Sequence, residues 1–94
     1  LLLRLGRRAK REGRWPEALA FWNEAIAFAS GFDPRPWEEI AKYYEHWRRD
    51  LAAAHGVAAR ALARAEAEGA QEAIQASLAH RLSRLTRRSG LAIR

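Results

Sequence analysis

The chain of 94 residues contains no cysteine and no methionine. The lack of cysteine excludes disulfides, thiolate metal ligands and a cysteine nucleophile. The lack of methionine, even at position 1, leads us to expect a processed chain or a piece excised from a longer protein. No apolar run approaches the ~20 residues needed to cross a bilayer, so we expect a cytoplasmic protein with no membrane partner. We expect no metal and no cofactor.

Valine and isoleucine are also scarce, with five copies in the whole chain. This scarcity of β-branched residues argues against a sheet. Alanine, by contrast, occurs 21 times, and Leu, Arg and Glu are the next most prominent residues. All four are strong helix formers. The composition therefore predicts an all-α fold.

Turn residues and apolar spacing divide the chain into five predicted helices. They span residues 1–12, 16–30, 36–49, 51–68 and 70–88. Asp33 or Arg35 is expected near the start of the third helix, and Asp50 is expected to cap the fourth. The connections are short, so successive helices should pack as antiparallel hairpins. A loose tail is expected after Gly90.

The net charge of +6 is unevenly distributed. Residues 1–14 carry six basic groups and one acid, residues 15–76 carry six and ten, and residues 77–94 carry five and none. Two basic ends of +5 therefore flank a middle of −4. Of the 17 cations, 15 are arginine, whose planar fork suits carboxylate or phosphate.

Small and aromatic residues recur at matching steps in two copies, 36 residues apart. The repeated positions are Ala18, Trp22 and Ala25 in the first copy and Ala54, Ala58 and Ala61 in the second. The segment before each copy contains Leu5-Gly6 and Ile40-Ala41, and Tyr44 follows in the second. This pattern resembles the tetratricopeptide repeat.

The resemblance implies antiparallel helical hairpins of a tetratricopeptide-like solenoid. We expect a single domain over 1–94, with one repeat over about 1–31, a second over about 34–68 and a capping helix over about 70–88. Two positions depart from the pattern, because Ala9 stands where an aromatic is expected and Ala58 where a large residue is expected. The two repeats are therefore degenerate.

A narrower resemblance rests on the string Pro-Trp-Glu-Glu-Ile-Ala-Lys-Tyr-Tyr-Glu-His at 36–46, together with Arg49-Asp50 and the segment 80–85. These segments resemble the C-terminal repeat tail of bacterial ribonuclease-H-like, DEDD-exonuclease-type proteins. The resemblance implies a nucleic-acid setting and a nuclease domain upstream. This chain would carry none of the catalytic acids, so we expect it not to be an enzyme.

The residues themselves suggest no catalytic or metal site. His46 and Asp50 share a helix face, but two ligands on one helix are too few for zinc. Glu45 is expected to pair with Arg48 or Arg49 instead. No nucleophile is spaced to form a triad with a histidine.

Most aromatic residues are predicted to lie in the core, and two are predicted to be open to a ligand. The predicted core aromatics are Trp15, Trp22, Phe28, Trp37 and Tyr44. Tyr43 and Trp47 are the two that could contact a ligand, for instance by base stacking next to cations.

Arginines form two stripes at helical spacing. The first consists of Arg4, Arg7, Arg8 and Arg11, and the second of Arg81, Arg84 and Arg88, opposite Leu78, Leu82 and Leu85. Such stripes are commonly solvated faces. The alternative is a binding role, in which Arg81, Arg84 and Arg88 would contact nucleic acid without sequence preference.

In tetratricopeptide arrays the first helix of each pair lines a concave groove. Carried onto this chain, the resemblance implies a groove lined by Leu3, Arg4, Arg7, Lys10, Arg11, Arg35, Glu38, Lys42, Glu45 and His46. We expect it to bind an acidic protein or peptide partner. Three alternatives stay open: a nucleic-acid contact, a structural or dimerisation element using Leu1, Leu2 and Leu5, or an idle surface where Glu38 and Lys42 pair.

Overall fold

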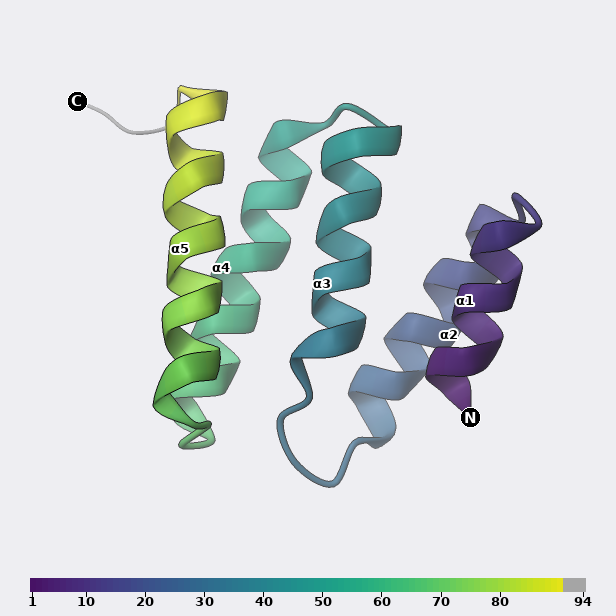
Figure 1. Cartoon of the computed structure of the whole chain (residues 1–94), viewed down its shortest axis with the longest axis horizontal. Helices are drawn as coiled ribbons and strands as arrows, with labels where there is room; N and C mark the ends of the chain where they lie inside the picture. Colours follow the sequence, from purple (N-terminus) through teal and green to yellow (C-terminus); the bar gives the residue numbers. More distant parts are fainter. Residues whose placement is uncertain (91–94) are drawn as a thin grey trace.

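The computed structural model describes residues 1–90 of the chain. These residues form five α-helices and one short π-helix, and no strand. The elements are α1 (Leu2–Arg11), α2 (Trp15–Phe28), α3 (Pro34–Lys42), η1 (Tyr43–Trp47), α4 (Leu51–Ala67) and α5 (Glu72–Ser89) (Figure 1). The all-α prediction is confirmed. The predicted tail after Gly90 lies outside the described residues.

Side-chain caps fix two of the helix starts. The Asp33 carboxylate accepts a hydrogen bond of 3.0 Å from the backbone N–H of Arg35, so α3 begins at Pro34 rather than at Pro36. The Asp50 carboxylate accepts one of 3.0 Å from an N–H in the first turn of α4, as predicted. Both acids therefore satisfy helix N–H groups that have no partner within their own helix.

The third predicted helix does not remain an α-helix to its end. Its last turn is η1, in which the N–H of Arg48 donates to the carbonyl of Tyr43, five residues back, at 3.0 Å. Arg49 then adopts a left-handed φ of 56°, which ends the helix. A π-turn holds an additional residue, so it changes the direction of the side chains that follow it.

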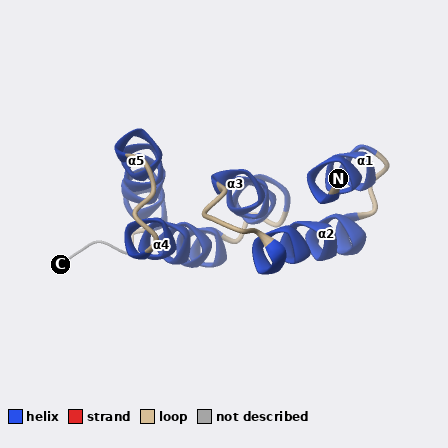
Figure 2. Ribbon diagram, turned by 90° about the horizontal axis from the view of Figure 1, so that it is seen from below, coloured by secondary structure: helices blue, strands red, loops and turns tan. Residues whose placement is uncertain are grey.

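The helices are arranged in two layers. Helices α1, α3 and α5 lie in one layer, and α2 and α4 lie in the other (Figure 2). Each helix packs on the next one along the chain and runs antiparallel to it (Figure 1). Helix α2 therefore packs against both α1 and α3, which lie in the other layer (Figure 2).

Small side chains allow the helices to approach closely. Ala18 and Trp22 of α2 are fully buried in the larger apolar cluster, against α1 and α3. Ala54 and Ala58 of α4 form a second cluster with Leu85 of α5. The small side chains of α4 leave room for the leucine, and this contact fixes the position of α5.

Two aromatic predictions are wrong. Phe28 was expected in the core, but it is the last residue of α2 and is 79% exposed. Tyr43 was expected to be open to a ligand, but it is buried against Trp15, with 5.0 Å between the ring centroids. Trp47 is exposed, and its ring lies 5.2 Å from that of Trp15.

Candidate functional site

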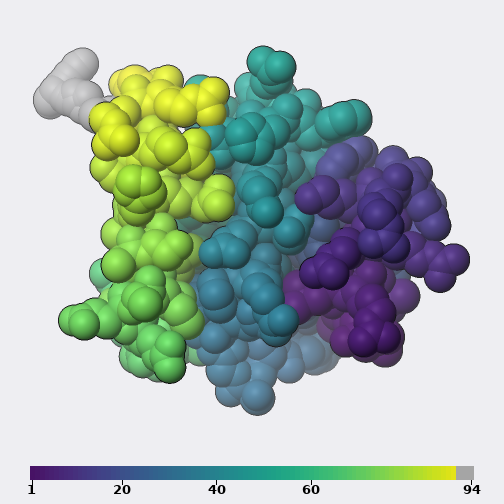
Figure 3. Space-filling view, viewed as in Figure 1, coloured from purple at the N-terminus to yellow at the C-terminus, as the bar shows by residue number. Residues whose placement is uncertain are grey.

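A cleft separates α1 from α3 on the face formed by α1, α3 and α5 (Figure 3). It consists of a cavity of about 110 Å³ and an adjoining open depression near the start of α1. We call it the α1–α3 cleft, and it is lined by Leu1, Leu3, Arg4, Arg7, Trp22, Arg35, Glu38 and Glu39. Apolar and charged side chains therefore meet in one concave surface.

Not every arginine of the cleft is equally free to bind a ligand. Arg35 donates to both oxygens of Asp33, with its Nε at 3.0 Å from one and its Nη2 at 2.8 Å from the other. This contact lowers the pKa of Asp33, chiefly through the Arg35 hydrogen bond. Arg4 and Arg7, by contrast, form no ion pair with any acid among residues 1–90. Their charges are open to a ligand.

The remaining cations of α1 are likewise either paired with an acid or unpaired within the described residues. Arg8 pairs with Glu12 at 3.2 Å on its own helix. Lys10 reaches across to α3 and donates to Glu39 at 3.0 Å. Arg11 has no acidic partner within the described part of the chain. The unpaired charges of α1 are therefore Arg4, Arg7 and Arg11, on one stripe of the helix.

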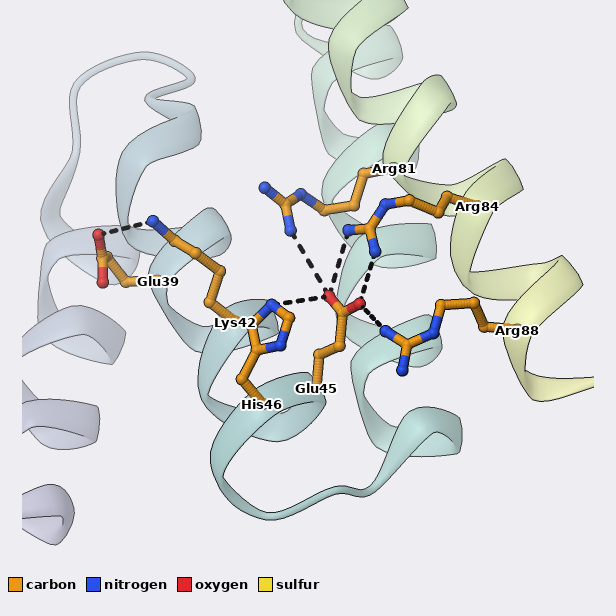
Figure 4. Close-up of polar contacts among 7 residues, drawn as sticks. All are labelled: Glu39, Lys42, Glu45, His46, Arg81, Arg84 and Arg88. Carbon is orange, nitrogen blue, oxygen red and sulfur yellow. Dashed lines mark hydrogen bonds and ion pairs between the residues drawn. The ribbon is translucent and has the colours of Figure 1, made fainter.

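Glu39 links α1 to α3. Besides Lys10, it pairs with Lys42 at 3.4 Å. Burial raises the pKa of Glu39, but the hydrogen bond from Lys10 and the charge of Lys42 lower it below its usual value overall. The alternative in which Glu38 pairs with Lys42 is wrong, because the amine of Lys42 is directed to Glu39 (Figure 4).

A second charged cluster lies between η1 and α5. Glu45 is 1% exposed, and its carboxylate receives the guanidinium groups of Arg81, Arg84 and Arg88 (Figure 4). Arg84 binds both of its oxygens, at 2.6 and 3.2 Å. The Nη1 atom of Arg81 lies 3.9 Å from Oε1 of Glu45, and Arg88 donates a hydrogen bond to Oε2. The Nε2 atom of His46 lies 3.6 Å from Oε1.

The prediction that Glu45 pairs with Arg48 or Arg49 is therefore wrong. Glu45 faces α5 from the π-turn, whereas Arg48 and Arg49 follow the end of that turn and are exposed. Since its side chain is buried and fully bonded, Glu45 also does not line an accessible groove. The hydrogen bond from Arg84 lowers the pKa of Glu45 below its usual value, against the raising effect of burial.

The predicted stripe on α5 also differs from a fully solvated face. The side chains of Arg81, Arg84 and Arg88 are 23%, 34% and 49% exposed, respectively, because their guanidinium groups contact the carboxylate of Glu45. Leu78 and Leu85 of the same helix are buried. Both faces of α5 therefore contact the rest of the protein, one through leucines and the other through arginines.

The predicted groove residues do not form one surface. Arg4, Arg7, Arg35 and Glu38 line the α1–α3 cleft. Lys10 and Lys42 meet at Glu39, and Glu45 and His46 belong to the cluster at α5. Arg11 is exposed on α1.

Three residues of the cleft, Leu1, Trp22 and Glu39, were not among the predicted groove residues. Trp22 was assigned to the core, and it is indeed buried, but its ring also forms part of the cleft wall. Glu39 carries a signal that could have revealed it, because it is one of two adjacent acids on the helix that faces the basic helix α1.

The described residues carry no cluster of three or more His, Cys, Asp or Glu side chains that could hold a metal ion. Within residues 1–90, no helix is long and apolar enough to cross a membrane.

Comparison with known proteins gives no match: no protein-family model, no curated protein and no solved structure corresponds to this chain. The resemblance to tetratricopeptide repeats and that to the tail of ribonuclease-H-like proteins therefore stay predictions.

Proposed function

We propose that this chain is a non-catalytic interaction module that binds an acidic segment of a partner protein in the α1–α3 cleft. The observation that carries the proposal is that Arg4 and Arg7, which have no acidic partner among residues 1–90, lie beside the apolar side chains of Leu1 and Leu3. A peptide with carboxylates and an apolar side chain matches both features.

Physical reasoning supports a ligand at these arginines. Like charges at adjacent positions of one helix face repel each other and destabilise the helix slightly. Arg4 and Arg7 receive no compensating acid from this chain within residues 1–90. A carboxylate from a partner would supply it, because the planar guanidinium fork binds a carboxylate through two parallel hydrogen bonds.

The cleft also offers more than charge. Leu3 lines both of its parts, and the buried ring of Trp22 forms part of the wall. Glu38 on the α3 side would repel an acid placed too far from α1. The cleft therefore favours one orientation, with the carboxylates of the segment on α1. The tetratricopeptide resemblance, which implies a concave binding surface on the first helix of each pair, agrees with this assignment.

The proposal can be tested with a fluorescein-labelled peptide of alternating Glu and Leu, and with the same peptide carrying Gln in place of Glu. Fluorescence anisotropy should show saturable binding of the first peptide and none of the second. The double variant Arg4→Glu/Arg7→Glu should weaken binding by about a hundredfold, because two charge-assisted hydrogen-bonding groups are lost and reversed.

The matched control is Arg60→Glu/Arg87→Glu, which reverses two arginines that are exposed on α4 and α5, away from the cleft. It removes the same charge from the molecule. Its affinity for the peptide should stay within about threefold of the wild-type value, since distant charges are screened and contribute little. Equal weakening by both double variants would show that only the net charge attracts the peptide, and the cleft assignment would then be abandoned.

A further inference from the structure

More positive charge surrounds Glu45 than the fold requires. Three arginines contact this one carboxylate, each with a guanidinium nitrogen within 3.9 Å of it. A single bidentate arginine, such as Arg84, would be enough to compensate one buried carboxylate. The cluster therefore holds a surplus of two positive charges, before His46 is counted.

Within residues 1–90, no other acid compensates the surplus charge. Glu72, in the first turn, is the one acid of α5, whereas the arginines lie near the other end of the helix. In the described part of the chain, the ion pairs of these three arginines all go to Glu45. Glu45 thus holds the three guanidinium groups close together with one negative charge between them, at a cost in repulsion.

The three arginines are bound to Glu45 on one side and are exposed to solvent on the other. Glu45 has a fully buried side chain and binds them from within, while 23% to 49% of each arginine side chain is exposed. The ring of His46 lies at the edge of the cluster and is 64% exposed (Figure 4). Each guanidinium carries five N–H donors, so most donors of the three groups are not used by Glu45.

We propose that this cluster, formed by Arg81, Arg84, Arg88 and His46 and called here the α5 arginine cluster, binds the phosphate group of a phosphorylated side chain in a partner protein. A phosphate monoester carries a charge of about −1.5 to −2 at neutral pH, which matches the surplus of two at one point. Its three oxygens accept several hydrogen bonds, and Glu45 holds the guanidinium groups in place beforehand.

A nucleic-acid backbone fits this surface less well. Its phosphodiesters carry one charge each and are spread along a strand, whereas the α5 arginine cluster concentrates its charge around one carboxylate. The other basic surface, on α1, is separated from α5 by α3 (Figure 2). A strand that contacts both would pass Glu38 and Glu39 of α3, which repel it. The charge pattern therefore favours a compact dianion.

The inference does not depend on the α1–α3 cleft, because the two sites share no residue. It can be tested with N-acetyl phosphoserine amide, inorganic phosphate, the unphosphorylated serine amide and a labelled single-stranded oligonucleotide. In NMR spectra, the Nε–H signals of Arg84 and Arg88 should shift saturably with both phosphate compounds and not with the serine amide. Stronger binding of the phosphoserine amide than of inorganic phosphate would identify a phosphorylated side chain as the better source.

The informative variant is Arg81→Gln, because Arg81 has the longest contact with Glu45 and its loss leaves the other two arginines on the carboxylate. It should weaken binding of the phosphoserine amide about tenfold. Arg87→Gln is the matched control: it removes the same charge from the same helix, but Arg87 is exposed and donates to Ser83. Its affinity for the phosphoserine amide should stay within about twofold of the wild-type value.

Three results would overturn the proposal. The first is the absence of saturable shifts with either phosphate compound. The second is equal weakening by Arg81→Gln and Arg87→Gln, which would indicate diffuse attraction rather than a site. The third is an oligonucleotide that binds more tightly than the phosphoserine amide and loses affinity in Arg81→Gln, which would assign the cluster to nucleic acid.

Discussion

Gly6 of α1 lies directly against the indole ring of Trp22 in α2. A Cβ atom at Gly6 would lie 2.3 Å from Nε1 and 2.7 Å from Cδ1 of that ring. Trp22 is 1% exposed and belongs to the larger apolar cluster, so its ring cannot shift without disturbing the side chains packed around it. Only the absence of a side chain at Gly6 allows α1 to pack on α2 at this distance.

Gly6→Ala should therefore destabilise the protein by about 1–3 kcal/mol, because overpacking outweighs the gain in helix propensity of ~1 kcal/mol. Urea unfolding followed by circular dichroism measures this change. Gly56→Ala in α4 is the control, since its Cβ would meet only the flexible end of Arg60 at 3.4 Å. That change should stabilise by up to ~1 kcal/mol, and a similar loss in both variants would contradict the packing explanation.

Glu45→Gln should lower the free energy of unfolding at pH 7 by about 2–3 kcal/mol, because three arginines lose their counter-charge. The pKa of Glu45 is lowered in the folded protein, so its carboxylate stabilises the fold fully above the usual value of 4.5. This contribution is lost as the pH falls through the lower, folded-state pKa. The difference between the wild type and the variant should therefore shrink at acidic pH.

Chemical denaturation at a series of pH values from about 7 to 3 would measure this difference. Glu24→Gln is the control, because Glu24 is exposed on α2 and forms no ion pair in the described part of the chain. Its effect should be near zero at every pH. A difference for Glu45→Gln that does not change with pH would show that the carboxylate charge is not the source.

Lys10→Gln should lower the free energy of unfolding by about 0.5–1 kcal/mol. The loss is small because the ion pair with Glu39, which joins α1 to α3, is partly exposed. Arg11→Gln, one position further on, should change stability by less than about 0.5 kcal/mol because Arg11 has no acidic partner in residues 1–90. A double-mutant cycle of Lys10→Gln with Glu39→Gln measures the coupling. A coupling of zero would contradict the link between the helices.

Self-association through the open end of the first helix pair is also expected. Leu1 is 88% exposed and Phe28 is 79% exposed, and both line one shallow depression together with Leu2 and Leu3. Exposed apolar surface of this kind favours contact with another copy. Sedimentation velocity should show a concentration-dependent dimer that Phe28→Ser abolishes, while Trp47→Ser, at another exposed aromatic, does not. A monomer at all concentrations would refute the expectation.

Local sequence determined most of the secondary structure. Alanine content, the prolines and glycines between segments and the capping acid Asp50 place the helices, because each of these signals acts within a few residues. The spacing of Ala18 and Trp22 likewise marks their buried face, because the period of an α-helix fixes which residues share a side.

The partners of Glu45 were decided only by the tertiary structure. The sequence offers 15 arginines as possible partners for Glu45, and nothing local selects Arg84, 39 residues away. That choice depends on η1, which directs Glu45 toward α5, and on the contact of Leu85 with the alanines of α4, which fixes α5. Nothing in the sequence distinguishes Arg4 and Arg7 from Arg84. They nevertheless form no ion pair, because the fold places no acid of residues 1–90 next to them. The arginines are chemically identical, and for a carboxylate that points away from its own segment, such as Glu45, the fold alone determines which of them it meets.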